Sequence, residues 1–408
     1  MNSQSTIQSI RKRHVAYDYR GHSASVERHS IHTYPAMLHY LMVRDLIGKY
    51  TKTDSLIYDP FCGSGVSLVE ALNAGRSVYG TDINPLALLI THVRSSNYDE
   101  CSLLKTFNSL QHQFNSLPLD VPKVKNMDFW FKGNVVENLG KIRHFISQIQ
   151  DENVKRFFLC VFSETVRKVS NNRNSEFKRY RIRDIANHNP DTMAIFENTF
   201  RLFTRTVITD PIPNSNFKLF LHDIRTPVPF DEKVDLVITS PPYGDSRTTV
   251  AYGQFSSFSL DWIRGLNPFG DADLSLDRLC LGGKMTNNND FLPSEVLYKT
   301  LESIADRKRF EDVLQFYCDL FVSCNHIFNA LNETATVCFI VGDRQVSGVQ
   351  IPMDLVVADF FQSLGLSLKK ILIREISNKR MPSVNSPTNV TGITSSTMKN
   401  EYIVILEK

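Results

Sequence analysis

The sequence predicts an α/β fold: an open, mostly parallel sheet of seven strands with helices between them. Three apolar runs carry this prediction. Over residues 58–70 a short apolar run leads through a glycine loop into an amphipathic helix, the run at 77–81 ends in Asp82, and the run at 235–239 enters a pair of prolines. Strands that alternate with helices are typical of parallel sheets, and ligands of such sheets bind at the carboxyl ends of the strands.

The remaining elements follow from apolar spacing along the chain. The seven expected strands lie at about residue 58 and at 77–81, 217–223, 235–239, 335–341, 368–373 and 402–406. In addition to the helix after the glycine loop, period-3.6 spacing predicts helices at 38–47, 86–93, 311–331 and 354–364.

The glycine loop is the first candidate binding element. Gly63 and Gly65 allow a ligand to approach the backbone closely, and the helix that follows offers its N-terminal NH groups. Asp82 ends the next strand, about 20 residues after the glycines, where nucleotide-binding folds place a carboxylate on ribose hydroxyls. We therefore expect a nucleotide-like cofactor above this loop, with Asp82 as its ribose ligand.

The second candidate element is Ser240-Pro241-Pro242-Tyr243 at the end of a buried strand. Neither proline can donate a backbone hydrogen bond or change its φ angle freely. The loop should therefore hold its carbonyls and the ring of Tyr243 in a fixed arrangement beside the cofactor. An ordinary strand-terminating turn is the alternative.

Both motifs resemble those of a known family. Asp59-Pro60-Phe61-Cys62-Gly63-Ser64-Gly65 is similar to the S-adenosylmethionine-binding motif of the DNA amino-methyltransferases, and Ser240-Pro241-Pro242-Tyr243 to their catalytic motif. The resemblance implies a Rossmann-like S-adenosylmethionine-dependent methyltransferase fold whose last strand is antiparallel. Because Ser240 stands where adenine enzymes more often have Asp or Asn, it implies methylation of cytosine N4.

The resemblance also implies which residues bind S-adenosylmethionine. The segment before the first helix resembles the element that closes over the methionine end of the cofactor, although His32 could instead cap that helix. Asp223 resembles the residue that accepts from the adenine amino group, with a helix cap as its alternative. The implied cofactor-binding residues are His32, Tyr34, Pro35, Asp59, Pro60, Phe61, Cys62, Gly63, Ser64, Gly65, Asp82, Ile83, Asn84, Asp223 and Ser240.

Composition indicates the cellular compartment but does not indicate the substrate. Lys and Arg exceed Asp and Glu by 46 to 43, so the net charge of +3 says little about partners. The seven cysteines show neither CxxC spacing nor a His pattern for zinc, which predicts reduced thiols, no metal and a cytoplasmic protein. Residues 1–19 contain no apolar run that could direct export or span a membrane.

Four regions are expected. Residues 1–28 lack periodicity and read as a flexible arm, and residues 29–95 with 217–408 form the methyltransferase core. Residues 96–216 show helical signals and form an inserted, basic DNA-binding region. Residues 265–305, rich in Gly, Asn and Asp, form a second insertion for which target recognition is one reading.

The inserted region carries a basic run between residues 155 and 183. A run of this kind is a solvated face in many proteins, but for an enzyme that acts on a polyanion it favours contact with phosphates. The expected DNA-contacting residues are Arg167, Lys168, Arg173, Lys178, Arg179, Arg181 and Arg183.

The predicted reaction is direct methyl transfer to the exocyclic amine of a base in double-stranded DNA. Acceptors that hydrogen-bond the amine raise its reactivity, and Ser240 with the carbonyl of Pro241 would supply them. The base must leave the duplex and stack on an aromatic face, for which Tyr243 is the candidate. No Pro-Cys dipeptide is present, which disfavours attack by a cysteine.

Three other functions stay open at this point. They are an adenine-N6 DNA methyltransferase, an RNA guanine-N2 methyltransferase, and a non-catalytic nucleic-acid-binding protein on the same scaffold. The cytosine-N4 reading implies a restriction-modification system in a bacterial or archaeal cell, with a cognate restriction endonuclease as partner.

Overall fold

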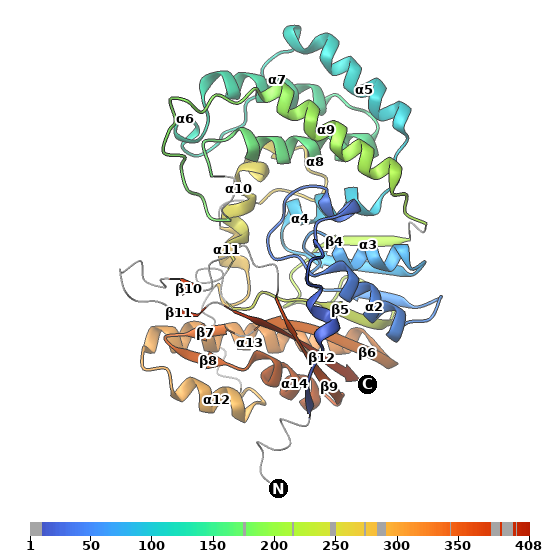
Figure 1. Cartoon of the computed structure of the whole chain (residues 1–408), viewed down its shortest axis with the longest axis vertical. Coiled ribbons are helices and arrows are strands. Elements are labelled where there is room, and N and C mark those ends of the chain that lie inside the picture. Colours follow the sequence, from blue (N-terminus) through green and yellow to red (C-terminus); the bar gives the residue numbers. More distant parts are fainter. Residues whose placement is uncertain are drawn as a thin grey trace.

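The computed structural model describes most of the chain. The described residues are 10–173, 177–213, 216–244, 250–272, 275–283, 291–342, 344–376, 384–385, 395–396 and 398–408. They form an elongated molecule, with a sheet covered by helices at one end and a group of helices at the other (Figure 1).

One large sheet organises the first of these ends. It has eight strands in the order β1-β9-β12-β6-β5-β2-β3-β4. The strands are β1 (Arg11–Arg13), β2 (Leu56–Asp59), β3 (Ser77–Asp82), β4 (Phe217–Leu221), β5 (Val234–Thr239), β6 (Leu331–Gly342), β9 (Ser367–Glu375) and β12 (Asn400–Glu407). Two short pairs lie outside it, β7 (Arg344–Val346) with β8 (Val349–Ile351) and β10 (Val384–Asn385) with β11 (Ser395–Ser396).

The sheet is parallel except at one strand. The neighbours from β4 to β6 all pair in parallel, whereas β12 is antiparallel to both β6 and β9. All seven predicted strands are present, and the expected antiparallel last strand is confirmed. The methyltransferase-type α/β fold predicted from the sequence is therefore confirmed, with β1 as an additional strand.

Side-chain alternation along the strands gives the sheet two buried faces. On β6, Val337, Phe339 and Val341 belong to one hydrophobic core, and Cys338 and Ile340 belong to another. Successive residues of a strand point to opposite faces, so helices must cover both. The first core includes residues of α12 (Glu295–Glu302), α13 (Arg307–Ala330) and α14 (Met353–Ser363), and the second includes residues of α2 (Tyr40–Tyr50) and α3 (Val66–Asn73).

A third core lies in the helices between β3 and β4. They are α5 (Glu100–Gln113), α6 (Met127–Trp130), α7 (Gly133–Ser147), α8 (Glu152–Val169) and α9 (Thr192–Thr209). Their apolar faces share this core with α4 (Pro85–Ser95) and α10 (Tyr252–Ile263), which connect them to the sheet. Asp N-caps begin α5, α8 and α9, each accepting from a backbone NH of the first turn.

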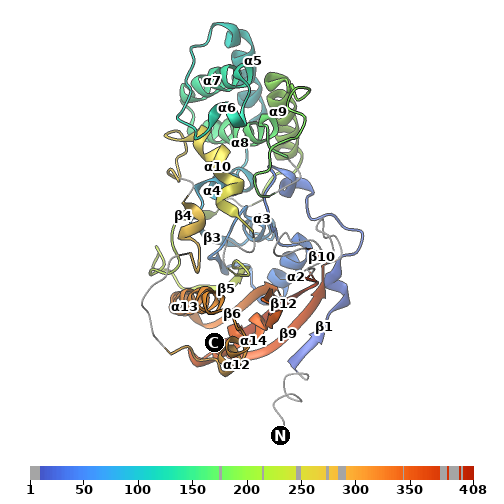
Figure 2. The same cartoon turned by 90° about the vertical axis from the view of Figure 1, so that its left-hand side faces the viewer.

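The expected flexible arm is wrong for residues 10–28. β1 extends the edge of the sheet by pairing in parallel with β9 (Figure 2), and 3-10 turns follow at Val15–Asp18 and Glu27–Ser30. Arg11 donates two hydrogen bonds to the buried carboxylate of Asp354, at 2.8 and 2.7 Å. Ion pairing thus fixes a segment that has no apolar periodicity. Residues 1–9 of the expected arm lie outside the described residues.

No helix among the described residues combines the length and the apolar content needed to cross a bilayer.

Candidate active site

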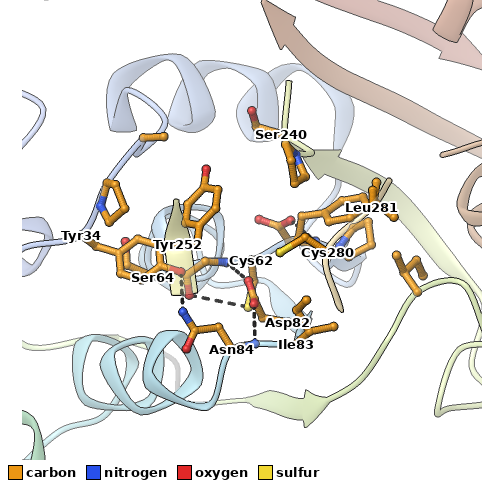
Figure 3. Close-up of a pocket in the computed structure, with 18 of the residues that line it drawn as sticks. Tyr34, Cys62, Ser64, Asp82, Ile83, Asn84, Ser240, Tyr252, Cys280 and Leu281 are labelled. Atoms are coloured by element: carbon orange, nitrogen blue, oxygen red, sulfur yellow. Dashed lines mark hydrogen bonds between the residues drawn. The ribbon is translucent and has the colours of Figure 1, made fainter. Parts of the chain in front are cut away.

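A cavity opens at the carboxyl ends of the central strands. About 930 Å³ of space lies between its walls, open solvent at the mouth included. The loops after β2, β3, β4 and β5 line it, together with residues 34–38 and 276–281. In the view of Figure 3, Tyr34 and Tyr252 lie on one side of the cavity and Cys280 and Leu281 on the other.

Most of the residues predicted to bind the cofactor line this cavity. The structure brings together Tyr34, Pro35, Asp59, Pro60, Phe61, Cys62, Gly63, Ser64, Asp82, Ile83, Asn84, Asp223 and Ser240. His32 and Gly65 are absent from its lining.

The two glycines of the loop are needed for different structural reasons. Both have positive φ angles, +49° at Gly63 and +79° at Gly65. A Cβ at Gly65 would lie 2.5 Å from the side chain of Thr91, so this glycine permits close packing of α3 on α4. Gly63 lies at the cavity, where its NH donates to Asp82 at 2.9 Å.

Asp82 is a buried carboxylate that the backbone holds in place. Its oxygens accept from the NH groups of Gly63 and of Asn84, the latter at 2.8 Å. Burial outweighs these bonds and raises the pKa of Asp82 to about 6. A ligand that donates hydrogen bonds to Asp82 would therefore favour the ionised form.

Asp59 connects two strand ends beneath the cavity. It accepts from the hydroxyls of Thr239, at 2.6 Å, and of Ser67. Burial raises its pKa to about 6 as well. The start of the glycine loop is thereby tied to the end of β5, immediately before Ser240.

Asn84 connects the cavity to two other segments. Its side-chain amide donates to Ser256 on α10 at 2.8 Å and to the hydroxyl of Tyr34 at 3.3 Å. Its carbonyl oxygen caps α4 by accepting from the NH of Leu86. The same side chain thus begins a helix and fixes one wall of the cavity.

His32 does not reach the cavity, so its predicted cofactor contact is wrong for this structure. Its ring is buried against α8, with Nε2 3.0 Å from the hydroxyl of Ser163 and Nδ1 2.7 Å from the carbonyl of Thr33. Burial lowers its pKa to about 4, so the ring is neutral at pH 7. His32 fastens the segment before α2 to the helical region.

Arg94 is a site residue that the sequence analysis missed. Its fully buried guanidinium donates to the carbonyl of Ser64 at 3.0 Å and to the hydroxyl of Ser64 at 2.9 Å. It also donates to the carbonyls of His29, Ile31 and His32. Burial lowers its pKa to about 10. A single arginine in the otherwise apolar face of α4 was the available signal.

The Ser-Pro-Pro-Tyr motif follows β5 at the rim of the cavity. Ser240 and Pro242 line it, whereas Pro241 and Tyr243 do not. The hydroxyls of Ser240 and Tyr243 lie 2.9 Å apart, and the hydroxyl of Tyr243 donates to Glu401 on β12 at 3.2 Å.

The Asp223 end of the cavity is closed by residues of the region 265–305. Leu276, Leu279, Cys280 and Leu281 line it, a role that their sequence does not reveal. Arg225 holds this end together, since it donates to Asp223 at 2.6 Å, to Asp319 at 3.0 Å and to the carbonyl of Leu279 at 2.7 Å. Within this region, residues 273–274 and 284–290 lie outside the described residues.

Arg167, a member of the predicted DNA-contacting set, is not available to phosphates, and Lys168 is partly engaged within the protein. Arg167 is only 5% exposed; its guanidinium lies 3.7 Å from the ring centroid of Phe255 and donates to the carbonyl of that residue. Lys168 pairs with Glu164 at 3.5 Å and donates to Thr199. Both belong to α8. The prediction that Arg167 contacts phosphates is wrong for this structure, whereas Lys168, whose side chain is 37% exposed, stays a predicted phosphate contact.

The rest of the set lies on one loop. We call residues 171–183 the basic loop, of which 174–176 lie outside the described residues. Asn172 and Arg181 form an antiparallel bridge, and the NH of Arg173 donates to the carbonyl of Tyr180 at 2.8 Å. Arg181 and Arg183 are exposed, as are Phe177 at 37% and Tyr180 at 48%.

The basic loop lies against α10, the helix that also reaches the cavity. The guanidinium of Arg179 lies 5.2 Å from the ring centroid of Phe258, and the rings of Phe177 and Phe255 are 6.2 Å apart. Tyr252, at the start of the same helix, lines the cavity. The exposed cations and the cavity are therefore connected through one helix.

Among the residues that the structure describes, no three His, Cys, Asp or Glu side chains gather as a metal site requires.

Comparison with known proteins identifies the family. A family model described as DNA methylase matches residues 9–91. The Type II methyltransferase M.MvaI of Kocuria varians is 35% identical over 418 residues, which cover 93% of this chain and 90% of that protein. The Type II methyltransferase M.MjaII of Methanocaldococcus jannaschii is 31% identical over 103 residues, 24% of this chain and 19% of that protein.

A solved structure, the rRNA methyltransferase aviRa from Streptomyces viridochromogenes, is 10% identical. The match covers 92% of this chain and 88% of that chain, with a TM-score of 0.32.

The fold is that of a methyltransferase. On the long match to M.MvaI and the family model, the chain belongs to the DNA amino-methyltransferases, which methylate cytosine N4 or adenine N6. Membership implies S-adenosylmethionine as methyl donor and DNA as substrate.

Proposed function

We propose that the protein transfers a methyl group from S-adenosylmethionine to the N4 amine of a cytosine flipped out of duplex DNA. The observation that carries this proposal is the position of Ser240, which follows β5 at the rim of the cavity that Asp82 and the glycine loop line. A base whose amine lies at Ser240 would be adjacent to a cofactor in that cavity.

The residues of the cavity suit the proposed cofactor. Asp82 presents a carboxylate to the ribose hydroxyls, and Ile83 with Leu281 offers apolar surface to the adenine ring. The carboxylate of Asp223, although paired with Arg225, lies at the cavity where it can accept from the adenine amine. When bound, S-adenosylmethionine supplies a methyl group on a sulfonium, which an amine displaces directly.

The role of the protein in that step is to position and activate the amine. In our proposal the hydroxyl of Ser240 and the carbonyl of Pro241 accept hydrogen bonds from the amine, which concentrates its lone pair on nitrogen. A near-attack geometry requires the nitrogen and the methyl carbon about 3–3.5 Å apart. Attack by a thiolate is disfavoured, because burial raises the pKa of Cys280 to about 12 and that of Cys62 well above its usual range.

DNA contact is proposed for the basic loop. Arg181 and Arg183 are exposed on it, with Phe177 and Tyr180 between the cations as surfaces for sugar or base. Phosphate contacts of this kind give affinity without sequence preference. The ring of Tyr243 is proposed to stack on the flipped base.

The target base is the most specific part of the proposal. Serine can accept from the amine of cytosine or of adenine, so Ser240 favours cytosine only through its resemblance to the cytosine-N4 motif. The test is to express the protein in cells without DNA methylation, digest their DNA and identify the modified nucleosides by mass spectrometry.

N4-methylcytosine is the expected product. N6-methyladenine alone would overturn the choice of base, and the absence of any methylated base would overturn the whole proposal. Ser240→Ala and Tyr243→Ala should lose the product while S-adenosylmethionine still binds, because both residues act on the base.

The biological setting follows from the same proposal. Similarity to proteins named Type II methyltransferases supports a role in a restriction-modification system, where methylation protects host DNA. The partner would be a cognate restriction endonuclease that cuts the same site, and both would act in the cytoplasm of a bacterial or archaeal cell.

A further inference from the structure

A chain of hydrogen bonds joins the Ser-Pro-Pro-Tyr motif to two strands at the far side of the sheet. Ser240 Oγ lies 2.9 Å from the hydroxyl of Tyr243, which donates to Glu401 Oε1 on β12. Glu401 Oε2 accepts from two nitrogens of Arg374 on β9, Nε at 2.7 Å and Nη2 at 2.5 Å. Glu401 and Arg374 are almost fully buried, so this pair is shielded from solvent.

The backbone of the neighbouring strand leaves room for the ring of Tyr243. Glu401 pairs in register with Gly342 on β6. A Cβ at Gly342 would overlap the sulfur of Met398 and lie 2.7 Å from the ring of Tyr243, so a glycine here allows both side chains to lie against this strand without displacement. The position of the Tyr243 hydroxyl beside Glu401 is therefore determined by packing as well as by hydrogen bonding.

The negative charge of Glu401 fixes which group donates and which accepts along this chain of hydrogen bonds. A carboxylate paired with arginine accepts hydrogen bonds and donates none. The single proton of the Tyr243 hydroxyl is used on Glu401, so its oxygen must accept from Ser240. The hydroxyl proton of Ser240 is thereby committed to Tyr243, and its oxygen presents only lone pairs to the base.

We infer that Glu401 is a positioning residue that makes Ser240 an obligate hydrogen-bond acceptor for the target amine. This inference rests on the proposed function and deepens it. An acceptor at this position attracts an amino group and repels a carbonyl oxygen. The same chain that activates the amine therefore disfavours a base such as thymine, which carries a carbonyl at the corresponding position.

The test separates the hydroxyl of Tyr243 from its ring. Tyr243→Phe keeps the ring and the Glu401–Arg374 pair but breaks the chain, whereas Glu401→Gln replaces the acceptor with an amide that can also donate. In single-turnover methylation of unmethylated plasmid DNA at saturating S-adenosylmethionine, each variant should be slower by roughly 10- to 100-fold. The Kd for S-adenosylmethionine should stay within about twofold.

The double variant is the sharper measurement. If both residues act through Ser240, Tyr243→Phe combined with Glu401→Gln should be no slower than the slower single variant. Glu375→Gln, on the same strand as Arg374 but with an exposed side chain, is the matched control and should keep the wild-type rate. Glu401→Gln could fail to fold, because Arg374 would lose its partner. In that case the methylation rate of Tyr243→Phe alone still tests the inference.

The possible outcomes distinguish failure of the role of Glu401 from failure of the proposed function. A wild-type rate in Tyr243→Phe, or rate losses that multiply in the double variant, would overturn the role of Glu401 and leave the proposed methylation intact. Absence of methylation by the wild-type protein would instead contradict the proposed function itself.

Discussion

Arg94 donates two hydrogen bonds to Ser64, one to its carbonyl and one to its hydroxyl, at 3.0 and 2.9 Å. A fully buried side chain of α4 thus holds the glycine loop in place. The same guanidinium binds three carbonyls of residues 29–32, so the loop and the segment before α2 share one support.

Arg94→Lys should destabilise the protein strongly. Lysine has three donors for five buried oxygen acceptors, so at least two would lose their partner. We expect the free energy of unfolding to fall by about 2–4 kcal/mol. Urea denaturation measures it, with Arg201→Lys, an exposed ion pair on α9, as a control that should change little. Equal stability of the two variants would contradict the role of Arg94.

Asp82→Ala should weaken binding of S-adenosylmethionine. The substitution removes a charge-assisted hydrogen bond worth about 1.5–3 kcal/mol, or roughly 10- to 100-fold in Kd. Calorimetry gives the value directly, and Asp54→Ala, an exposed acid before β2, is the matched control. Unchanged affinity in Asp82→Ala would remove this residue from the cofactor site.

Binding of S-adenosylmethionine should weaken below about pH 6. Burial raises the pKa of Asp82 from 3.8 to about 6, and the proposed ribose contact requires the ionised carboxylate. At pH 5 about a tenth of this group is ionised, so its contribution to affinity should fall roughly tenfold. Titrations at pH 5 and 7.5 test this, and Asp82→Asn should show a smaller pH dependence than the wild type.

Stability of the ligand-free protein should change in the opposite direction. Asp59 and Asp82 bind protons more tightly in the folded state than in the unfolded state, since both pKa values are raised to about 6. The part of the unfolding free energy that comes from these two groups therefore decreases as the pH rises from about 4 to about 6.

Removal of cations from the basic loop should weaken DNA binding in a salt-dependent way. Replacing Lys178, Arg181 and Arg183 with Ala should lower the slope of log K against log salt by about 0.9 for each phosphate that the loop no longer neutralises. Lys52→Ala with Lys233→Ala, two exposed cations before β2 and β5, should leave the slope unchanged. If the loop variant keeps the wild-type slope, this surface does not contact DNA.

Gly342→Ala should reduce turnover without affecting the cofactor. The new methyl group would overlap the sulfur of Met398 and lie 2.7 Å from the ring of Tyr243, so both side chains must move and the ring is displaced from Glu401. We expect a methylation rate lower by at least about tenfold, as for removal of one well-placed hydrogen bond, and an unchanged Kd for S-adenosylmethionine. Gly48→Ala on α2, with no atom within 4 Å of the added carbon, is the control. Normal turnover in Gly342→Ala would show that the ring tolerates displacement.

The sequence alone was sufficient to predict those parts of the fold and site whose pattern lies within one short stretch of residues. The run at 335–341 alternates between two cores, and the glycine loop is contiguous, so both the sheet and most of the cavity lining could be predicted. His32 was misplaced because its polar surroundings are the same whether it faces a ligand or Ser163. Glu401 was missed because its partners Tyr243 and Arg374 come from the loop after β5 and from β9, and only the folded sheet brings them together.

The pairing of β1 with β9 sets the order in which the chain can fold during synthesis. Arg11 is in register with Ile371, and the side chain of Arg13 bonds the carbonyl of Ile373, 360 positions later. At about 5–20 residues per second, the N-terminal strand leaves the ribosome roughly 20–70 s before its partner. Until then the three basic residues of β1 remain without a strand partner, and the 360 positions that separate Arg13 from Ile373 must be synthesised before this edge of the sheet can close.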